Sequence, residues 1–218
     1  MSKKRKRINE ENPGSLCTLP VAFIITIVPL IVFMRVTELT QIEVINWYGE
    51  STYTDFFSYY KSQWLIIGTV MAVVFYLAYS LVKGFKFQKS FLYIPAAVYA
   101  ALIILSTVTS EFPQIALRGF VARYEGMFVL LCYLALMFIV FNLVKTESQI
   151  RFLFGALLIS ASVIGIIGIF QFLGLDLFRS DLGKQLILPA AYQNIADKLS
   201  FRFEKTAVYS TLSNTNYV

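Results

Sequence analysis

The sequence predicts an all-α integral membrane protein, a polytopic bundle of about five transmembrane helices. Of its 218 residues, 57% are hydrophobic and only 15% are charged. Its mean hydropathy of +0.67 is higher than soluble domains reach. Five apolar windows have about the length that crosses a bilayer, roughly 20 residues. None contains an Asp, Glu, Lys or His in its interior, and they span residues 19–36, 64–82, 91–109, 127–144 and 152–175.

The alternative fold is a large soluble core in which these windows are buried helices. Such a core needs amphipathic helices to cover it, and the sequence has almost none. We therefore interpret residues 19–175 as a transmembrane region. A basic tail (1–18) precedes it, and an extracytoplasmic segment (176–218) follows it and leads toward a further helix.

The N-terminal tail begins MSKKRKR, which resembles the basic start of a signal peptide. The apolar run that follows is too long for a cleaved signal, and no small-residue cleavage site comes after it. The tail and first window therefore predict a retained signal anchor. Cys17 and Cys132 lie in or beside different predicted helices, so they indicate neither a disulfide nor a metal site. The chain has no histidine.

The orientation follows from lysine and arginine, which stay on the cytoplasmic side when they lie in short loops. The tail, the KGFKFQK loop (83–89) and the KTESQIR loop (145–151) are basic and alternate along the chain. One orientation places all three in the cytoplasm, so the N-terminus is expected there. The acidic, aromatic loop 37–63, the stretch 110–126 and residues after 175 are then expected outside.

The stretch SEFPQIALRGFVARYEG (110–126) carries two arginines between apolar windows. A helix over residues 116–125 places Arg118 and Glu125 opposite one apolar stripe. This pattern is typical of an interfacial helix on the outer leaflet, and Pro113 suits its first turn. The stripe consists of Leu117, Phe120, Val121 and Tyr124.

Two interpretations of Arg118 and Arg123 remain open. They either anchor the helix to lipid phosphates or pair with Glu111 and Glu125, as most surface charges do without further consequence. Alternatively, they form a phosphate site, because a guanidinium binds two phosphate oxygens at once and keeps its charge at any relevant pH.

The segment after residue 175 combines basic residues with one alternating pattern. Its cations are permitted outside because long loops are translocated despite their charge. Residues 199–204 alternate between apolar and polar, which predicts a short strand or an extended lid. Asn214 and Asn216 indicate a turn or a helix cap.

Three stretches together carry a family resemblance: SEFPQIALRGFVARYEG, FQFLGLDLF (170–178) and FEKTAVYSTLSNTNYV (203–218). In this order they resemble the first half of the O-antigen ligase and polymerase-like membrane proteins. The first family motif is met by Ser110, Pro113, Ala116, Leu117, Gly119, Arg123 and Gly126, with the proline offset by one residue. The second is met by Thr211, Leu212, Asn214, Asn216 and Tyr217, with Thr215 where proline is usual.

The resemblance implies a C-type glycosyltransferase of the bacterial cytoplasmic (inner) membrane, active in polysaccharide biosynthesis for the cell envelope. It would transfer a glycan from a polyprenyl diphosphate, such as undecaprenyl diphosphate, to an acceptor hydroxyl on the outer face. The expected partners are this lipid-linked glycan, an unidentified acceptor and membrane lipid; no cofactor, metal or nucleic acid is expected.

The resemblance also ranks the site residues. Arg123 matches the arginine of the family and is the first candidate for binding the lipid diphosphate, ahead of Arg118 and Arg202. Gly119, Gly126, Asn214 and Asn216 belong to the motifs as structural positions.

The family continues beyond the point where this chain stops. A further outer loop there carries more arginines and a histidine, so we expect this chain to be an N-terminal portion that is inactive alone. Ligase, polymerase and protein glycosyltransferase are not distinguished, because acceptor choice would lie in the later loop. Two other classes stay open: a transporter or flippase-like subunit for lipid-linked saccharide, and a non-catalytic assembly subunit.

Overall fold

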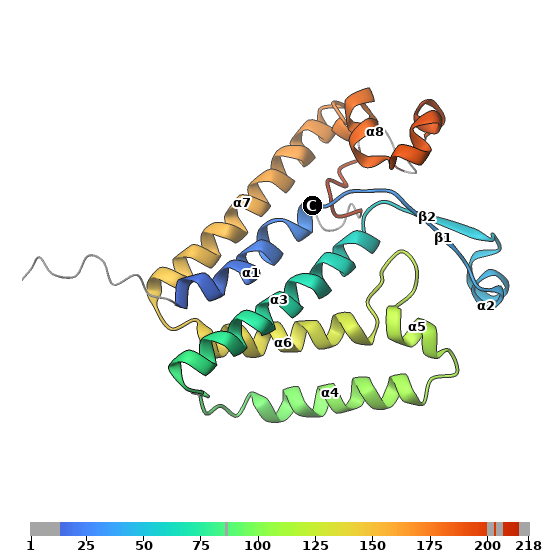
Figure 1. Ribbon diagram of the computed structural model, residues 1–218. Helices are drawn as coiled ribbons and strands as arrows, with labels where there is room; N and C mark the ends of the chain where they lie inside the picture. Colours follow the sequence, from blue (N-terminus) through green and yellow to red (C-terminus); the bar gives the residue numbers. More distant parts are fainter. Residues whose placement is uncertain (1–13, 86, 200–202, 204–206, 214–218) are drawn as a thin grey trace, which may run out of the picture.

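The computed structural model describes residues 14–85, 87–199, 203 and 207–213. Over these residues the chain is mostly helical, with one small hairpin (Figure 1). The described α-helices are α1 (Gly14–Thr26), α2 (Gln41–Glu43), α3 (Tyr59–Lys83), α4 (Tyr93–Val108), α5 (Pro113–Arg118), α6 (Met127–Leu143), α7 (Glu147–Phe172) and α8 (Asp181–Ile187). Shorter elements are η1 (Val28–Leu30), β1 (Arg35–Glu38), the π-helix η2 (Val44–Tyr48), β2 (Thr52–Asp55), η3 (Leu177–Arg179) and η4 (Ala190–Lys198).

Two of the described helices, α3 and α7, are long and apolar enough to cross a membrane. The most apolar 18-residue window has a mean hydropathy of 2.3 in α3 and of 2.5 in α7. Three shorter apolar helices, Thr18–Leu30, α4 and α6, overlap the remaining predicted windows. The helical class and an association with membrane are therefore supported, while the count of five spans stays a prediction.

The first predicted window, residues 19–36, is not one helix. Helix α1 ends at Thr26, the 3-10 turn η1 follows, and the strand β1 has begun by Arg35. Pro29 explains the end of α1, because proline has no amide hydrogen and its ring clashes with the carbonyl one turn earlier. The chain therefore leaves the bundle earlier than hydropathy alone predicts.

Many large apolar side chains on the described helices are exposed, which is the reverse of a soluble bundle. In α4, only Ile103 and Thr107 are buried, and Val108 is 76% exposed. In α7, only 17% of the most apolar window is buried. A helix in the core of a soluble protein would be mostly covered. These faces therefore fit an apolar surrounding such as acyl chains.

The bundle is built around α1, which packs between α3 and α7, while α6 packs on α3 and α4 packs on α6 (Figure 1). Small residues let α1 and α3 approach closely. A Cβ atom added to Gly68 would lie 2.7 Å from Cγ1 of Ile24, and Ala72, one turn further along α3, is fully buried.

The two ends of the bundle differ. Helices α1, α4 and α7 begin at the end where α3 and α6 finish, and the hairpin, α5 and α8 lie at the opposite end (Figure 1). The connections 84–92 and 144–146, which lie in or beside the predicted basic loops, are thus together at the first end. The first two stretches of the family resemblance, and the described residues of the third (203 and 207–213), reach or lie at the second end.

The hairpin fixes the start of α3. Strands β1 and β2 pair antiparallel, with Arg35 opposite Asp55. Oδ2 of Asp55 accepts hydrogen bonds from the amides of Ser58 (2.9 Å) and Tyr59 (2.7 Å), which have no partner within the helix. Burial raises the pKa of the Asp55 carboxyl, and these backbone hydrogen bonds act against that rise. The first turn of α3 is therefore held in place by β2.

A buried glutamine joins the end of α7 to the segment 207–213. Gln171 has no exposed surface, and its Oε1 accepts hydrogen bonds from the amides of Tyr209 (3.0 Å) and Ser210 (2.7 Å). Its Nε2 donates to Oδ1 of Asp176 at 3.2 Å. One side chain thus connects the second and third stretches of the family resemblance.

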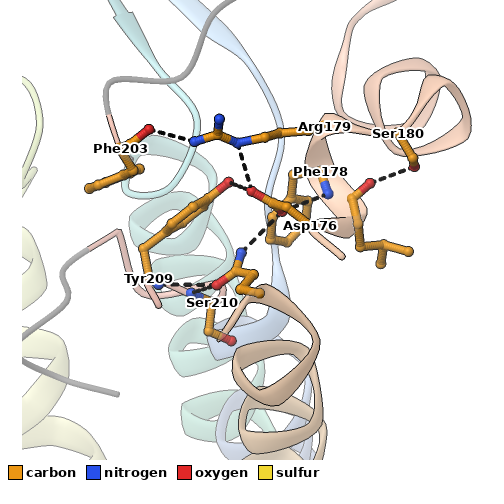
Figure 2. A network of polar contacts seen from close by, with 9 residues as sticks. Asp176, Phe178, Arg179, Ser180, Phe203, Tyr209 and Ser210 are labelled. Carbon is orange, nitrogen blue, oxygen red and sulfur yellow. Dashed lines mark hydrogen bonds and ion pairs between the residues drawn. The ribbon is translucent and has the colours of Figure 1, made fainter. Parts of the chain in front are cut away.

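Asp176 is the other centre of this network. Its Oδ2 accepts from the hydroxyl of Tyr209 (2.5 Å) and from Nε of Arg179 (3.0 Å), and Arg179 also donates to the carbonyl of Phe203 (2.5 Å) (Figure 2). The ring of Tyr209 stacks on Phe203 with 4.2 Å between centroids. Arg179, one of the predicted outer cations, therefore has a structural role.

Replacing Gln171 by Leu is expected to destabilise the fold by about 2–4 kcal/mol, because two buried amides lose their acceptor. Tyr209→Phe is the matched control: it removes one hydrogen bond to the Asp176 carboxylate, which keeps Arg179, and it preserves the ring stack, so it should cost about 1.5 kcal/mol. Thermal unfolding of the detergent-solubilised variants measures both. Equal losses would contradict the central position given to Gln171.

Candidate functional site

A cleft of about 730 Å³ opens at the end of the bundle that carries the hairpin. Its walls are the hairpin with α2, the first turns of α3, and the stretch from Glu111 to Val129. One part of the lining is polar and includes Arg35, Glu38, Glu111 and Arg118. The other part is apolar and includes Ile66, Leu117, Phe128 and Val129. The cleft is therefore amphipathic.

The predicted interfacial helix over residues 116–125 is wrong in its extent. Helix α5 begins at Pro113, which occupies the first turn as expected, but it ends at Arg118. Gly119 has φ +86°, a backbone conformation that a helix does not accommodate. The predicted apolar stripe is divided as a result: Val121 and Tyr124 are buried, while Phe120 is 42% exposed.

Gly119 and Gly126 form the neck of the loop that follows α5. A Cβ atom added to Gly119 would lie 2.7 Å from the amide nitrogen of Gly126, and one added to Gly126 would lie 2.5 Å from the carbonyl oxygen of Leu117. Only glycine allows these two backbones to touch. The structure thus gives a physical reason for both glycines of the motif.

The closed loop holds two non-glycine residues at positive φ, Ala122 (82°) and Tyr124 (54°). Such residues cost on the order of 1–3 kcal/mol each and persist where the surroundings impose them. Here the conformation turns the ring of Tyr124 into the protein, where it is 7% exposed. Burial raises the pKa of the Tyr124 hydroxyl to about 12 and the hydrogen bond with Thr37 acts against that rise, so the group is neutral at neutral pH.

Tyr124 contacts two elements of the opposite wall. Its ring meets Tyr59 edge-on, with 5.2 Å between centroids, and its hydroxyl lies 3.3 Å from that of Thr37. Tyr59 in turn lies under the guanidinium of Arg35, with 5.0 Å from Cζ to the ring centroid. The loop after α5 therefore supports the arginine on β1 through two aromatic rings.

An aromatic contact joins η2 to α5 beside the cleft. The ring of Trp47, on η2, meets Phe112 (5.4 Å) and Phe120 (5.1 Å) edge-on. The neighbouring hydroxyl of Tyr48 donates to the carbonyl of Val121 at 3.0 Å. The π-helix is thus attached to both flanks of α5.

The structure separates the three predicted diphosphate-binding arginines. Arg118 lines the cleft, whereas Arg123 is exposed on the adjacent loop and is not part of the lining. Arg202, together with Asn214 and Asn216, lies outside the described residues. Neither Arg118 nor Arg123 pairs with Glu111 or Glu125, since the ion pairs within the described ranges are Arg151–Glu147 and Arg179–Asp176.

Arg35 is a cleft residue that the sequence analysis missed. It lies inside the predicted window 19–36, where it was treated as the end of a transmembrane helix. One feature of the sequence could have identified it: Arg35 lies at the edge of an apolar run, three residues before Glu38. The early end of α1 gives it a different role, as the first residue of β1 in the wall of the cleft.

The charges of the cleft are mixed. The carboxylate of Glu43 is already hydrogen-bonded within the protein. Its Oε2 accepts from the amide and the hydroxyl of Thr40 (both 2.8 Å) in a capping box. Glu38 and Glu111 are exposed and face the same space as Arg35 and Arg118. Among the described residues, no cluster of His, Cys, Asp and Glu is suited to hold a metal.

Comparisons with protein-family models, with curated proteins and with solved structures found no match to this chain. The family resemblance therefore rests on the residues quoted above. The candidate site rests on the geometry of the cleft.

Three alanine substitutions separate the two constraints on the loop neck. Gly84 has φ +81° with open space around it, so Gly84→Ala adds strain alone and should cost about 1 kcal/mol. Gly126→Ala adds a backbone collision alone, which costs about 1–3 kcal/mol. Gly119→Ala adds both and should lower the thermal unfolding midpoint most. If Gly119→Ala behaved like Gly84→Ala, the neck would not constrain the loop.

Proposed function

We propose that this chain belongs to a membrane glycosyltransferase that uses a polyprenyl diphosphate-linked glycan, and that the cleft binds the diphosphate headgroup. The observation that carries the proposal is the cleft itself, lined by Arg118 of the motif stretch and by Arg35. Guanidinium groups suit phosphate because each donates two parallel hydrogen bonds and stays charged.

The amphipathic lining supports a lipid rather than a water-soluble anion. Ile66 and Phe128 line the cleft on its apolar part, and both belong to helices with exposed apolar faces. A prenyl chain would leave the cleft along such faces into the acyl region, while its headgroup stayed among the polar residues. A free sugar phosphate would gain nothing from the apolar part.

The two short basic connections between helices support an outer position for the cleft. Lys83, Lys145 and Arg151 lie at the bundle end opposite the hairpin. Basic connections of this length stay in the cytoplasm. With five spans, the cleft then faces the outer side of the cytoplasmic membrane, where the resemblance expects glycan transfer.

The chemistry asked of the cleft is electrostatic. When the glycan leaves its carrier, negative charge develops on the diphosphate. Fixed cations that are already aimed at those oxygens stabilise this charge without reorganising. The acceptor hydroxyl and its base are not assigned to residues of this chain, so the proposal covers the leaving-group half of the reaction.

Arg118→Ala is expected to weaken the binding of farnesyl diphosphate at least about tenfold, because a charge-assisted phosphate contact is lost. Arg118→Lys should recover only part of the affinity, since an ammonium does not bind two oxygens in parallel. Trp47 contacts Phe112 and Phe120 beside the cleft, so its fluorescence in a Trp64→Phe background reports binding.

Arg151→Ala is the control, because this arginine is exposed at the other end of the bundle and should not affect binding. A wild-type chain that binds no farnesyl diphosphate would refute the proposal. If binding depended on Arg118 but the protein never transferred glycan, the flippase-like alternative would be favoured.

Arg123 is tested in the same assay. The resemblance assigns it the phosphate contact, whereas the cleft lining includes Arg118 in its place. We expect Arg123→Ala to impair glycan transfer in the complete enzyme and to weaken farnesyl diphosphate binding less than Arg118→Ala does. A larger binding loss for Arg123→Ala would make Arg123 the principal phosphate contact.

A further inference from the structure

Arg35 is held in the cleft by a ring and not by a carboxylate. Its guanidinium lies over Tyr59 at 5.0 Å, and no ion pair joins it to any described acidic residue. Asp55, its cross-strand neighbour, is 6% exposed, and its carboxylate accepts hydrogen bonds from the amides at the start of α3. The guanidinium is therefore positioned while its charge is not neutralised by a paired carboxylate.

A cation held by an aromatic face keeps its hydrogen-bond donors. A cation–π contact acts on the charge of the guanidinium and supplies no hydrogen-bond acceptor, so it does not use the N–H groups. Five donors thus remain available for an anion that enters the cleft. Arg118, on the α5 wall, lines the same cleft and also has no ion pair with a described residue.

Part of the support under Arg35 comes from the wall that carries Arg118. The Tyr59 ring is flanked by Tyr60 (5.1 Å, perpendicular) and by Tyr124 (5.2 Å). Tyr124 is held inward by the loop that Gly119 and Gly126 close. The orientation of Arg35 consequently depends on the same stretch that supplies Arg118.

We propose that Arg35 and Arg118 form a two-point anion site in which Arg35 is the specificity-determining residue for a diphosphate over a monophosphate, positioned by Tyr59 and Tyr124. The inference rests on the proposed function, because it concerns the same cleft. A monophosphate satisfies one guanidinium, whereas a diphosphate presents two linked anionic groups and engages both. Removing Arg35 therefore removes selectivity more than it removes anion binding.

Two carboxylates in the cleft provide a test in which a substitution should strengthen anion binding. Glu38 and Glu111 face the cleft and repel an anion, although exposure to solvent screens them. Glu38→Gln should tighten the binding of farnesyl diphosphate about twofold to threefold. A merely structural change at the hairpin would not improve affinity.

The experiment compares farnesyl diphosphate with farnesyl monophosphate, using the whole chain in nanodiscs and Trp47 fluorescence. Arg35→Ala should lower affinity for the diphosphate about tenfold and for the monophosphate less than about threefold. Arg35→Lys should retain part of the selectivity. Tyr59→Phe keeps the ring and should preserve it, whereas Tyr59→Leu should reduce it as Arg35→Ala does. The same comparison applies to Tyr124, which is one ring further from Arg35: Tyr124→Phe should preserve the selectivity and Tyr124→Leu should reduce it.

The outcomes separate the inference from the proposed function. If Arg118→Ala weakens diphosphate binding and Arg35→Ala leaves the selectivity unchanged, the inference is overturned and the function stands. If the wild type binds neither probe, both fall. Wild-type binding without a preference for the diphosphate also overturns the inference. Arg35→Lys and Tyr59→Phe are conservative and keep the test valid where the larger changes impair folding.

Discussion

The backbone contact between Gly119 and Gly126 is the constraint on which the candidate site depends. Neither position has room for a Cβ atom, so glycine at both is what allows the chain between them to close into a loop. The loop then carries Ala122 and Tyr124 at positive φ, which an unconstrained loop would avoid. Strain of this kind is retained where the surrounding structure outweighs it, and it often marks a functional region.

This constraint acts on the cleft through aromatic rings and not through charge. Tyr124 supports Tyr59, and Tyr59 lies beneath the guanidinium of Arg35. Rings hold a cation without neutralising it, whereas a carboxylate would consume the charge that an anionic ligand requires. A site that must bind an anion and later release it gains from this arrangement, because the empty cleft offers no competing internal ion pair among its described residues.

The sequence predicted the helical class and the positions of the apolar segments, since hydropathy depends on composition within each segment. It failed where one residue redirected the backbone. Pro29 ends the first helix and makes Arg35 a strand residue, and Gly119 ends α5 at Arg118. The apolar stripe of residues 116–125 had correct helical spacing, but spacing does not reveal that two glycines seven positions apart will touch. Motif comparison pointed to Arg123, and only the fold distinguishes it from Arg118 as part of the cleft lining.

The start of α3 links the cleft to the C-terminal stretch. Asp55 caps this turn, Tyr59 faces Arg35, and the ammonium of Lys61 donates to the carbonyl of Thr211. Phe57, just before the helix, meets Tyr209 edge-on at 5.9 Å. Because one capped turn carries Tyr59 and Lys61, these residues cannot move independently of each other. The segment at residues 209–211 is thereby connected to the turn that carries the ring under Arg35, although the two lie far apart in the sequence. The first and third motif stretches are therefore linked through contacts of α3, which neither of them contains, while the second and third are joined directly by Gln171.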